Sequence, residues 1–174
     1  MKFHASTPVR QRRIDTPLGR VLLAATPTGL AGLWFEGQRH SPDSSRWVEA
    51  PADDALLQLA GTQVLEYFAG RRNQFDLPLD LSHGTPFQQA VWQALLGIAR
   101  GQTTRYGALA MQIGLPRAVR AVGAAVGRNP LSVVVPCHRV LGADGNLTGY
   151  AGGLERKAWL LNLEGAAWAE KVAA

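Results

Sequence analysis

Runs of hydrophobic residues in the first part of the chain alternate with short turns that contain proline and glycine. The turns Thr16-Pro17-Leu18-Gly19 and Thr26-Pro27-Thr28-Gly29 each place proline where φ is preset and glycine at the exit. The runs that flank these turns predict an antiparallel three-stranded meander, with strands near residues 11–16, 20–26 and 30–36.

Helical spacing replaces this pattern after a polar loop at residues 37–52. In DDALLQLAGTQVLEYFAG the apolar residues recur at the intervals of a helix face, at Leu57, Ala60, Val64 and Phe68. Gly70 is a typical helix stop. We therefore expect residues 1–80 to form an α/β N-terminal domain, a small antiparallel sheet with a helix.

A second helix signal follows the connector LPLDLSHG at residues 77–84. Thr85 predicts an N-cap, Pro86 fits the first helical position and Gln88 closes a capping box. The buried stripe of this helix is predicted to consist of Phe87, Val91, Ala94, Leu95 and Ile98, with the Trp92 indole also packing inward.

The next stretch, TTRYGALAMQIGLPRAVRAVGAAVGRNP, has the spacing of a helix-turn-helix. A short helix near 104–113 ends at Gly114, and a second helix runs from about 117 to 127. We expect residues 81–174 to form a mostly α, winged helix-turn-helix-like domain. Many proteins that do not bind DNA contain a similar helix pair, so the spacing alone is a weak signal.

The second of these helices, RAVRAVGAAV, consists mainly of small residues such as Ala121 and Gly123. Base reading in the major groove uses Asn, Gln, Arg or Lys side chains, which are few here. Such a helix suits close, sequence-tolerant contact with DNA, as in a minor groove. Taken alone, tight packing inside the protein is the better interpretation.

The distribution of charge along the chain changes the choice between DNA contact and internal packing for this helix. Residues 1–80 carry 9 basic and 9 acidic residues, so the net charge of +5 lies entirely in residues 81–174. Between Leu81 and Ala143 there is no acidic residue, and the stretch contains Arg100, Arg105, Arg117, Arg120, Arg128 and Arg139. A region of one sign favours a polyanion partner, although a solvated face with scattered arginines is an equal alternative on charge alone. Together with the helix pair, the charge favours DNA.

Composition excludes several other classes of protein. No apolar run approaches the length of a membrane span, and the N-terminal residues lack the apolar core of a secretory signal. The single cysteine among 174 residues excludes an internal disulfide and a cysteine-based zinc site. We expect a cytoplasmic protein that needs no cofactor and no metal.

The single cysteine, Cys137, stands in NPLSVVVPCHRVLG. The β-branched run before it predicts a buried strand or extended segment. A lone cysteine behind such a run is most often structural. His138 can act as a base, Arg139 favours the thiolate, and Glu164 is a candidate to orient the base. This chemistry leaves open a thiol hydrolase, a redox thiol and a group-accepting thiol.

The sequence around Cys137 closely resembles the O6-alkylguanine-DNA alkyltransferases, also called methylated-DNA–protein-cysteine methyltransferases. The resemblance rests on PCHRV, on RAVGAAVGRNP before it and on GYAGGLERKAWLLNLEG after it. It runs from about Thr85 to Gly165, and the N-terminal half also looks like that of this family. The form resembles the constitutive bacterial proteins.

The resemblance implies a repair reaction in double-stranded DNA that each molecule performs once. Cys137 would take the alkyl group from O6 of guanine irreversibly, His138 would accept the thiol proton through a water, and Glu164 would polarise His138. Tyr106 would donate a proton to the leaving guanine. The target base must rotate out of the duplex to reach the protein.

The resemblance also implies the residues that bind the base and the DNA. Base binding would involve Asn129, the carbonyl of Val140, Tyr150, Ala151, Gly152 and the pocket edge at Ser132. Arg120 would fill the vacated stack, beside the small residues Ala121 and Gly123. Arg117, Arg128 and Thr103 would contact the backbone. The protein is expected to be a monomer with no membrane partner, and cooperative binding along DNA is left open.

Two positions depart from some relatives of this family. Ala151 stands where some members carry serine, and Ser132 where some carry a second proline. Both changes predict a more open pocket that accepts O4-alkylthymine and larger alkyl groups.

Three other functions remain as alternatives. A non-catalytic DNA-lesion-binding protein would lack the acceptor cysteine, a transcription regulator would need base-reading side chains, and a thiol hydrolase would turn over repeatedly.

Overall fold

A computed structural model describes residues 7–169, so the prediction about a secretory signal falls partly outside the described residues. The chain forms two compact units. Met1–Thr85 and Pro130–Val134 make up the first, and Pro86–Asn129 and Val135–Ala174 make up the second. The chain therefore enters the first unit a second time, between Asn129 and Val135.

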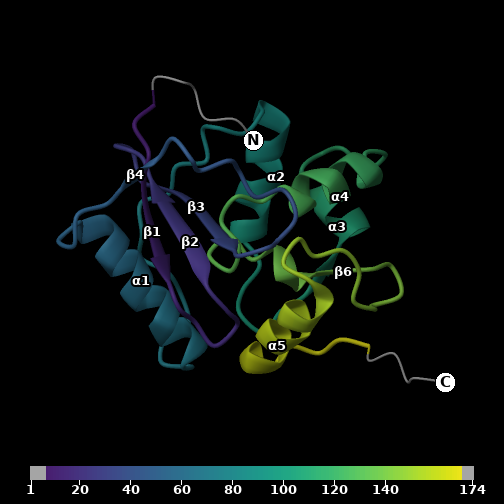
Figure 1. Ribbon diagram of the computed structural model, residues 1–174. Helices are drawn as coiled ribbons and strands as arrows, with labels where there is room; N and C mark the ends of the chain where they lie inside the picture. The colour runs from purple at the N-terminus through teal and green to yellow at the C-terminus, as the bar shows by residue number, and fades with distance from the viewer. Residues whose placement is uncertain (1–6, 170–174) are drawn as a thin grey trace. The chain divides into compact units, whose positions relative to one another are not determined.

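The first unit contains a four-stranded sheet in the order β3-β2-β1-β4 (Figure 1). The predicted antiparallel meander is confirmed, with strands β1 (Arg10–Ile14), β2 (Val21–Ala25) and β3 (Leu30–Phe35). The sheet is mixed rather than purely antiparallel, because β4 (Val48–Glu49) pairs with β1 in parallel. This short strand lies inside the segment 37–52 that was predicted to be a loop.

One helix packs on this sheet, as predicted. Helix α1 (Ala55–Phe68) begins after Asp54, whose side chain accepts a hydrogen bond from the backbone N–H of Leu57. It ends before Gly70, whose φ of 71° is readily adopted only by a residue without a side chain. Helix α1 lies beside β1 (Figure 1), and a Cβ at Gly61 would be in ordinary van der Waals contact, 3.7 Å from Ile14 of that strand.

The segment Pro130–Val134 lies along the edge of β3 in the first unit. The backbone N–H of Leu33 donates to the carbonyl of Pro130 over 2.8 Å, and that of Ser132 donates to the carbonyl of Leu33 over 3.0 Å. The predicted burial is confirmed, but the segment then turns, and Val133 has a positive φ of 73°. This backbone is strained for a β-branched residue, so the surrounding packing overrides its strand propensity.

The second unit is built around three helices, α2 (Pro86–Leu96), α3 (Tyr106–Gln112) and α4 (Val119–Gly127). Helix α2 begins at Pro86 as predicted, and Trp92 is buried with its indole N–H donating to the carbonyl of Ala125 over 2.9 Å. Helices α3 and α4 form the predicted helix-turn-helix, with Gly114 at φ 75° in the turn.

The remaining elements of the second unit lie on either side of the cysteine. A single 3₁₀ turn, η1 (Cys137–Arg139), leads into strand β6 (Val140–Leu141). Strand β6 pairs in parallel with β5 (Thr104–Arg105), and helix α5 (Leu154–Glu164) closes the unit. The predicted fold class, an α/β domain followed by a mostly α winged helix-turn-helix-like domain, is confirmed. Within residues 7–169, no helix is long and apolar enough to cross a membrane.

Candidate active site

Cys137 begins the 3₁₀ turn and is buried, with 5% of its surface exposed. Its sulfur accepts a hydrogen bond from the side-chain amide of Asn129, at 3.0 Å between Nδ2 and Sγ. The same amide nitrogen donates to the carbonyl of Val135 over 2.8 Å, so Asn129 links the end of α4 to the chain before the cysteine. Burial raises the pKa of the Cys137 thiol, while the Asn129 hydrogen bond and the charge of Lys157 act in the opposite direction.

His138, the next residue in the turn, is fully buried. Its Nε2 lies 2.5 Å from Oε1 of Glu164, while no described residue hydrogen-bonds to its buried Nδ1. Burial lowers the pKa of His138 despite the neighbouring carboxylate, so the ring is neutral at pH 7 and able to accept a proton. The structure thus brings the predicted base and its orienting carboxylate together.

Arg139 completes this buried group. Its Nε donates to Oε2 of Glu164 over 2.8 Å and its Nη2 donates to Oε1 over 3.2 Å. Oε2 also accepts from the backbone N–H of Gly101 over 3.3 Å. Arg139 therefore neutralises Glu164, whereas the sequence had suggested that its charge would favour the Cys137 thiolate.

Tyr106 is the first residue of α3, and its hydroxyl faces the loop before α5. The hydroxyl lies 3.3 Å from the carbonyl oxygens of both Thr148 and Gly149. Burial raises the pKa of Tyr106, so its hydroxyl keeps its proton at neutral pH. A Cβ at Gly123 would lie 3.8 Å from the Tyr106 ring, so α4 passes close to the aromatic face.

Apart from Asn129, which follows α4, the predicted base-binding residues of the second unit lie on β6 and the loop that follows it. Tyr150 and Gly152 are buried and Ala151 is partly exposed. The carbonyl of Val140 accepts a hydrogen bond from the Lys157 ammonium group. Ser132, by contrast, belongs to the first unit, where its hydroxyl donates to Oε1 of Gln38 over 3.2 Å.

The predicted DNA-binding residues of the helix-turn-helix are accessible. Arg117, Arg120, Ala121 and Arg128 are exposed, and Gly123 is partly exposed. None of the three arginines forms an ion pair with an acidic residue inside the described range 7–169. Their guanidinium groups are therefore available to a polyanion.

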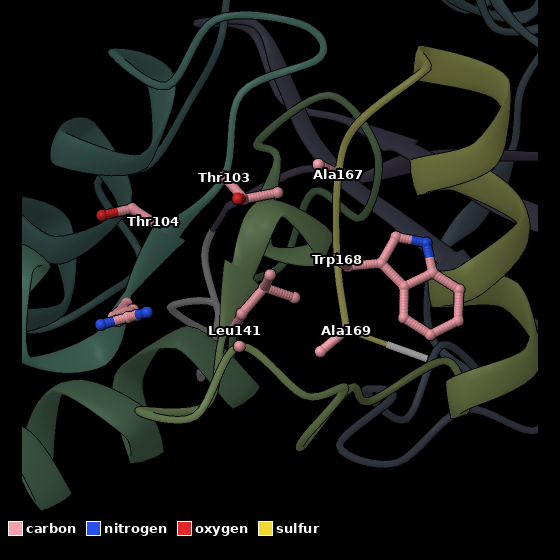
Figure 2. A pocket seen from close by; sticks show the side chains of 8 residues that line it. Thr103, Thr104, Leu141, Ala167, Trp168 and Ala169 are labelled. Atoms are coloured by element: carbon pink, nitrogen blue, oxygen red, sulfur yellow. The ribbon is translucent and has the colours of Figure 1, made fainter. Parts of the chain in front are cut away.

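Thr103 lies apart from these arginines, in a pocket of about 440 Å³. Figure 2 shows Leu141 between Thr104 on one side and the segment Ala167–Ala169 on the other. The Trp168 indole turns toward α5 and donates to Oδ1 of Asn162 over 3.2 Å. The residues lining this pocket do not include Cys137, His138 or Tyr106, so it is separate from the candidate acceptor.

Comparison with known proteins matches both parts of the chain to domains of one protein family. Residues 9–81 match the ribonuclease-like domain of 6-O-methylguanine DNA methyltransferase, and residues 86–166 match its DNA-binding domain. A methylated-DNA–protein-cysteine methyltransferase of Mycobacterium tuberculosis is 47% identical over 156 residues, covering 90% of this chain and 92% of that protein. The chain belongs to the 6-O-methylguanine DNA methyltransferase family.

An archaeal relative and two solved structures match the chain to the same family. A methylated-DNA–protein-cysteine methyltransferase of Methanosarcina barkeri is 45% identical over 152 residues, which cover 87% of this chain and 94% of that protein. The crystal structure of Mycobacterium tuberculosis OGT in complex with DNA matches with a TM-score of 0.82 and 47% identity. It covers 90% of this chain and 92% of that one. The O6-methylguanine-DNA methyltransferase of Pyrococcus kodakaraensis gives a TM-score of 0.62 at 26% identity, covering 91% and 99% of the two chains.

Lys157 is the residue of this site that the sequence analysis missed. It lies on α5, is fully buried, and its ammonium group donates to the carbonyls of Val140 and Thr148. The signal was present as a helical stripe, because the buried residues of α5 are spaced i, i+3, i+4 and i+7, at Lys157, Leu160, Leu161 and Glu164. Glu164 was identified as a candidate from its place in LNLEG and from the family resemblance. Lys157 follows the charged residues Glu155 and Arg156 and was not singled out.

Proposed function

We propose that Cys137 is the alkyl acceptor of this methyltransferase and that His138, Glu164 and Tyr106 carry its proton transfers. The protein repairs DNA by direct transfer of an alkyl group to its own single cysteine. The proposal is carried by one observation, the buried Cys137 thiol next to a neutral His138 whose Nε2 is held by Glu164. This arrangement is that of an activated nucleophile, with a base and a group that orients it.

The reaction forms one bond and breaks one bond. The sulfur of Cys137 attacks the alkyl carbon on O6 of guanine in line, the carbon–oxygen bond breaks, and the alkyl group stays on sulfur. His138 takes the thiol proton at Nδ1 through a water, because Nε2 is occupied by Glu164. Tyr106 gives a proton to the departing guanine, so protons balance across the step. The thioether is stable, and each molecule therefore reacts once.

The base and the duplex are held by residues of the second unit. The carbonyls of Cys137 and Val140 accept from the guanine amine, and Tyr150, Ala151 and Gly152 cover the base, while Asn129 braces the chain beneath it. Phosphate contacts by Arg117, Arg128 and Thr103 give affinity without sequence preference, as a repair protein requires. Arg120 fills the stack that the flipped base leaves, where Ala121 and Gly123 allow close approach.

The molecule acts where chromosomal DNA is found, in the cytoplasm, as a monomer that needs no cofactor or metal. Residues 1–80 form the core of the N-terminal domain, which Pro130–Val134 also joins, and the rest of residues 81–174 hold the acceptor and the DNA-binding surface.

Mass spectrometry after mixing with a duplex that holds one O6-methylguanine tests the proposal. We expect a gain of one methyl group on the peptide that contains Cys137, saturating at one per protein. The unmodified duplex and the Cys137→Ser variant are controls in which no gain is expected. Binding to the damaged duplex without a mass gain would contradict the acceptor role and favour a non-catalytic lesion-binding protein.

A further inference from the structure

The loop that follows β6 contacts the proposed proton donor before it reaches the residues that cover the base. The carbonyl oxygens of Thr148 and Gly149 both lie 3.3 Å from the Tyr106 hydroxyl. A tyrosine hydroxyl has one proton to donate, so these two carbonyls set the direction in which Tyr106 holds it. The position of the loop 142–149 therefore decides how the donor is aligned.

Hydrogen bonds within the loop 142–149 shape its first half as a tight turn. The backbone N–H of Gly142 donates to the carbonyl of Asn146 over 3.0 Å, and that of Gly145 donates to the carbonyl of Gly142 over 3.0 Å. The two carbonyls that face Tyr106 belong to residues after this turn, and both of those residues are exposed. Contacts from outside the loop must therefore hold this second half in place.

The chain that follows α5 supplies such contacts through its backbone. The N–H of Ala169 donates to the carbonyl of Gly145 over 3.1 Å, and Ala169 forms a one-residue parallel bridge with Asn146. A Cβ at Gly145 would lie 3.8 Å from the Cβ of Ala169, so the two backbones pass in van der Waals contact. The segment 166–169 is thus attached to the turn of the loop.

Side chains extend this attachment toward the residues that face Tyr106. Leu147 and Trp168 both pack against one buried apolar cluster. The cluster consists of Leu141, Leu161 and Ala166. The Trp168 indole also donates to Oδ1 of Asn162 over 3.2 Å, and Figure 2 shows it turned toward α5. Because Leu147 directly precedes Thr148, packing at Leu147 fixes the start of the stretch that contacts the donor.

The other side of the segment 166–169 faces open space. The pocket of about 440 Å³ lies there, with Thr104 on its opposite wall (Figure 2). The segment is therefore held from the side of α5 and the loop, and it has room to move into the pocket if those contacts are lost. Trp168 and Ala169 make those contacts.

We propose that Trp168 and Ala169 are positioning residues that hold the loop 142–149 against Tyr106 and so align its hydroxyl for proton transfer to the departing guanine. This inference rests on the proposed roles of Cys137 and Tyr106. The hydroxyl turns from the loop carbonyls to the guanine by rotation about one bond, which requires that the ring and the loop already be in place. Lys157 donates to the Thr148 carbonyl over 2.7 Å, so part of the alignment survives when the segment is released.

Two variants release the segment in different ways. Ala169→Pro removes the N–H that donates to Gly145, and Trp168→Ala removes the packing and the hydrogen bond to Asn162. We expect each to lower the single-turnover rate constant for methyl transfer from an O6-methylguanine duplex by about tenfold, since a small misplacement of a reacting group is costly. The affinity for the damaged duplex should not change.

The matched control is Ala167→Pro, at an exposed position whose N–H has no hydrogen-bond partner within residues 7–169. Its rate constant should equal that of the unmodified protein. An equal loss in Ala167→Pro would overturn the proposal, because proline in the segment and not the Ala169 hydrogen bond would then be the cause. Unchanged rate constants in both Ala169→Pro and Trp168→Ala would also overturn it.

Combination with Tyr106→Phe shows whether the segment acts through the hydroxyl. Tyr106→Phe lacks the proton donor, so adding Ala169→Pro should cause no further loss of rate. Losses that multiply would overturn the proposal, because a general disturbance of the fold gives that result. Trp168→Phe keeps most of the packing and should recover part of the rate that Trp168→Ala loses.

Backbone hydrogen exchange measures the attachment without methyl transfer. In Ala169→Pro we expect the N–H groups of Gly142 and Gly145 to exchange about tenfold faster, because the turn opens locally, while Val122 on α4 is unchanged. Equal exchange at the two glycines would overturn the proposal. Faster exchange with no methyl transfer even in the unmodified protein would instead refute the acceptor role of Cys137, and the attachment of the loop would stand.

Discussion

His138 is held at one ring nitrogen and leaves the other available for the thiol proton. Replacing His138 by Gln removes the base but leaves the Glu164–Arg139 pair in place. We expect the single-turnover rate constant for methyl transfer to fall by about 10² or more, the usual contribution of a positioned base. The affinity for the damaged duplex, measured alongside, should not change. A rate constant equal to that of the unmodified protein would exclude His138 as the base.

The same residue predicts how the reaction depends on pH. Protonated His138 cannot accept the thiol proton, so the rate must fall as pH drops through its pKa. Because burial lowers that pKa from 6.5, the loss should begin at a more acidic pH than an ordinary histidine would give. In His138→Gln this acid limb should disappear from the plot of single-turnover rate against pH. An acid limb that is unchanged in the variant would assign it to another group.

Ala151 predicts the range of lesions that the protein repairs. The small, partly exposed side chain leaves room at the edge of the base pocket and offers no hydroxyl near O6. We expect transfer from O4-methylthymine and from O6-benzylguanine in addition to O6-methylguanine, and Ala151→Ser should narrow this range. Ser132 contributes less to this prediction than its position suggested, since its hydroxyl is bound to Gln38. Rapid transfer from O6-methylguanine with refusal of both other lesions would contradict it.

At the scale of elements, the helix-turn-helix separates two roles for arginine. Arg120 lies on α4 and Arg117 in the turn before it, and both are exposed. Replacing Arg120 by Ala should slow transfer from duplex DNA by about tenfold or more, because nothing then offsets the few kcal/mol of base flipping. Transfer from a single-stranded oligonucleotide should change little. Equal losses on both substrates would argue against a role in flipping.

Arg117→Ala is the matched comparison. Losing one phosphate contact should weaken binding to any duplex, damaged or not, and reduce the slope of log affinity against log salt by about one. The ratio of duplex to single-strand transfer rates should stay as in the unmodified protein. These two variants therefore distinguish a residue that replaces a base from one that neutralises the backbone.

The elements also show which parts of the fold could be predicted from sequence. Strand β1 and helices α1 and α2 follow from local periodicity, since each buries one face, and β2 and β3 follow from the turn residues that bound their apolar runs. Strand β4 has two exposed residues and is held by backbone pairing with β1 and an exposed Arg13–Glu49 ion pair, so no apolar pattern marks it. The valines before Cys137 favour a strand by propensity, but they are packed on all sides and turn.

The residues of the site also divide into those that the sequence could predict and one that it could not. Cys137, His138 and Glu164 stand in sequence contexts that carry their chemistry, and the structure brings them together. No sequence motif marks Lys157, because its burial depends on which side of α5 packs into the protein. The sequence predicts a buried charge here only if the buried positions of the helix are assigned by their spacing and one of them is allowed to be charged.

At the scale of the whole molecule, alkylation of Cys137 should report on the stability of the fold. The sulfur is buried and accepts a hydrogen bond from Asn129, which also holds the carbonyl of Val135. A methyl group on the sulfur adds volume where the packing is closed, which typically costs about 1–3 kcal/mol. The chain between Asn129 and Val135 belongs to the first unit, so a disturbance at these two residues affects the ends of a segment from the other unit.

We therefore expect the methylated protein to melt a few degrees below the unreacted one, since about 1 kcal/mol shifts the Tm of a protein this size by roughly 2–4 °C. Differential scanning calorimetry before and after reaction with one equivalent of O6-methylguanine duplex, with the DNA removed, makes the comparison. Cys137→Ala carried through the same treatment should show no change, which separates alkylation from handling. Asn129→Ala, which lacks the hydrogen bond already, should lose less on methylation than the unmodified protein. Identical melting of reacted and unreacted protein would show that the acceptor site has room for the methyl group and that the spent molecule is as stable as the active one.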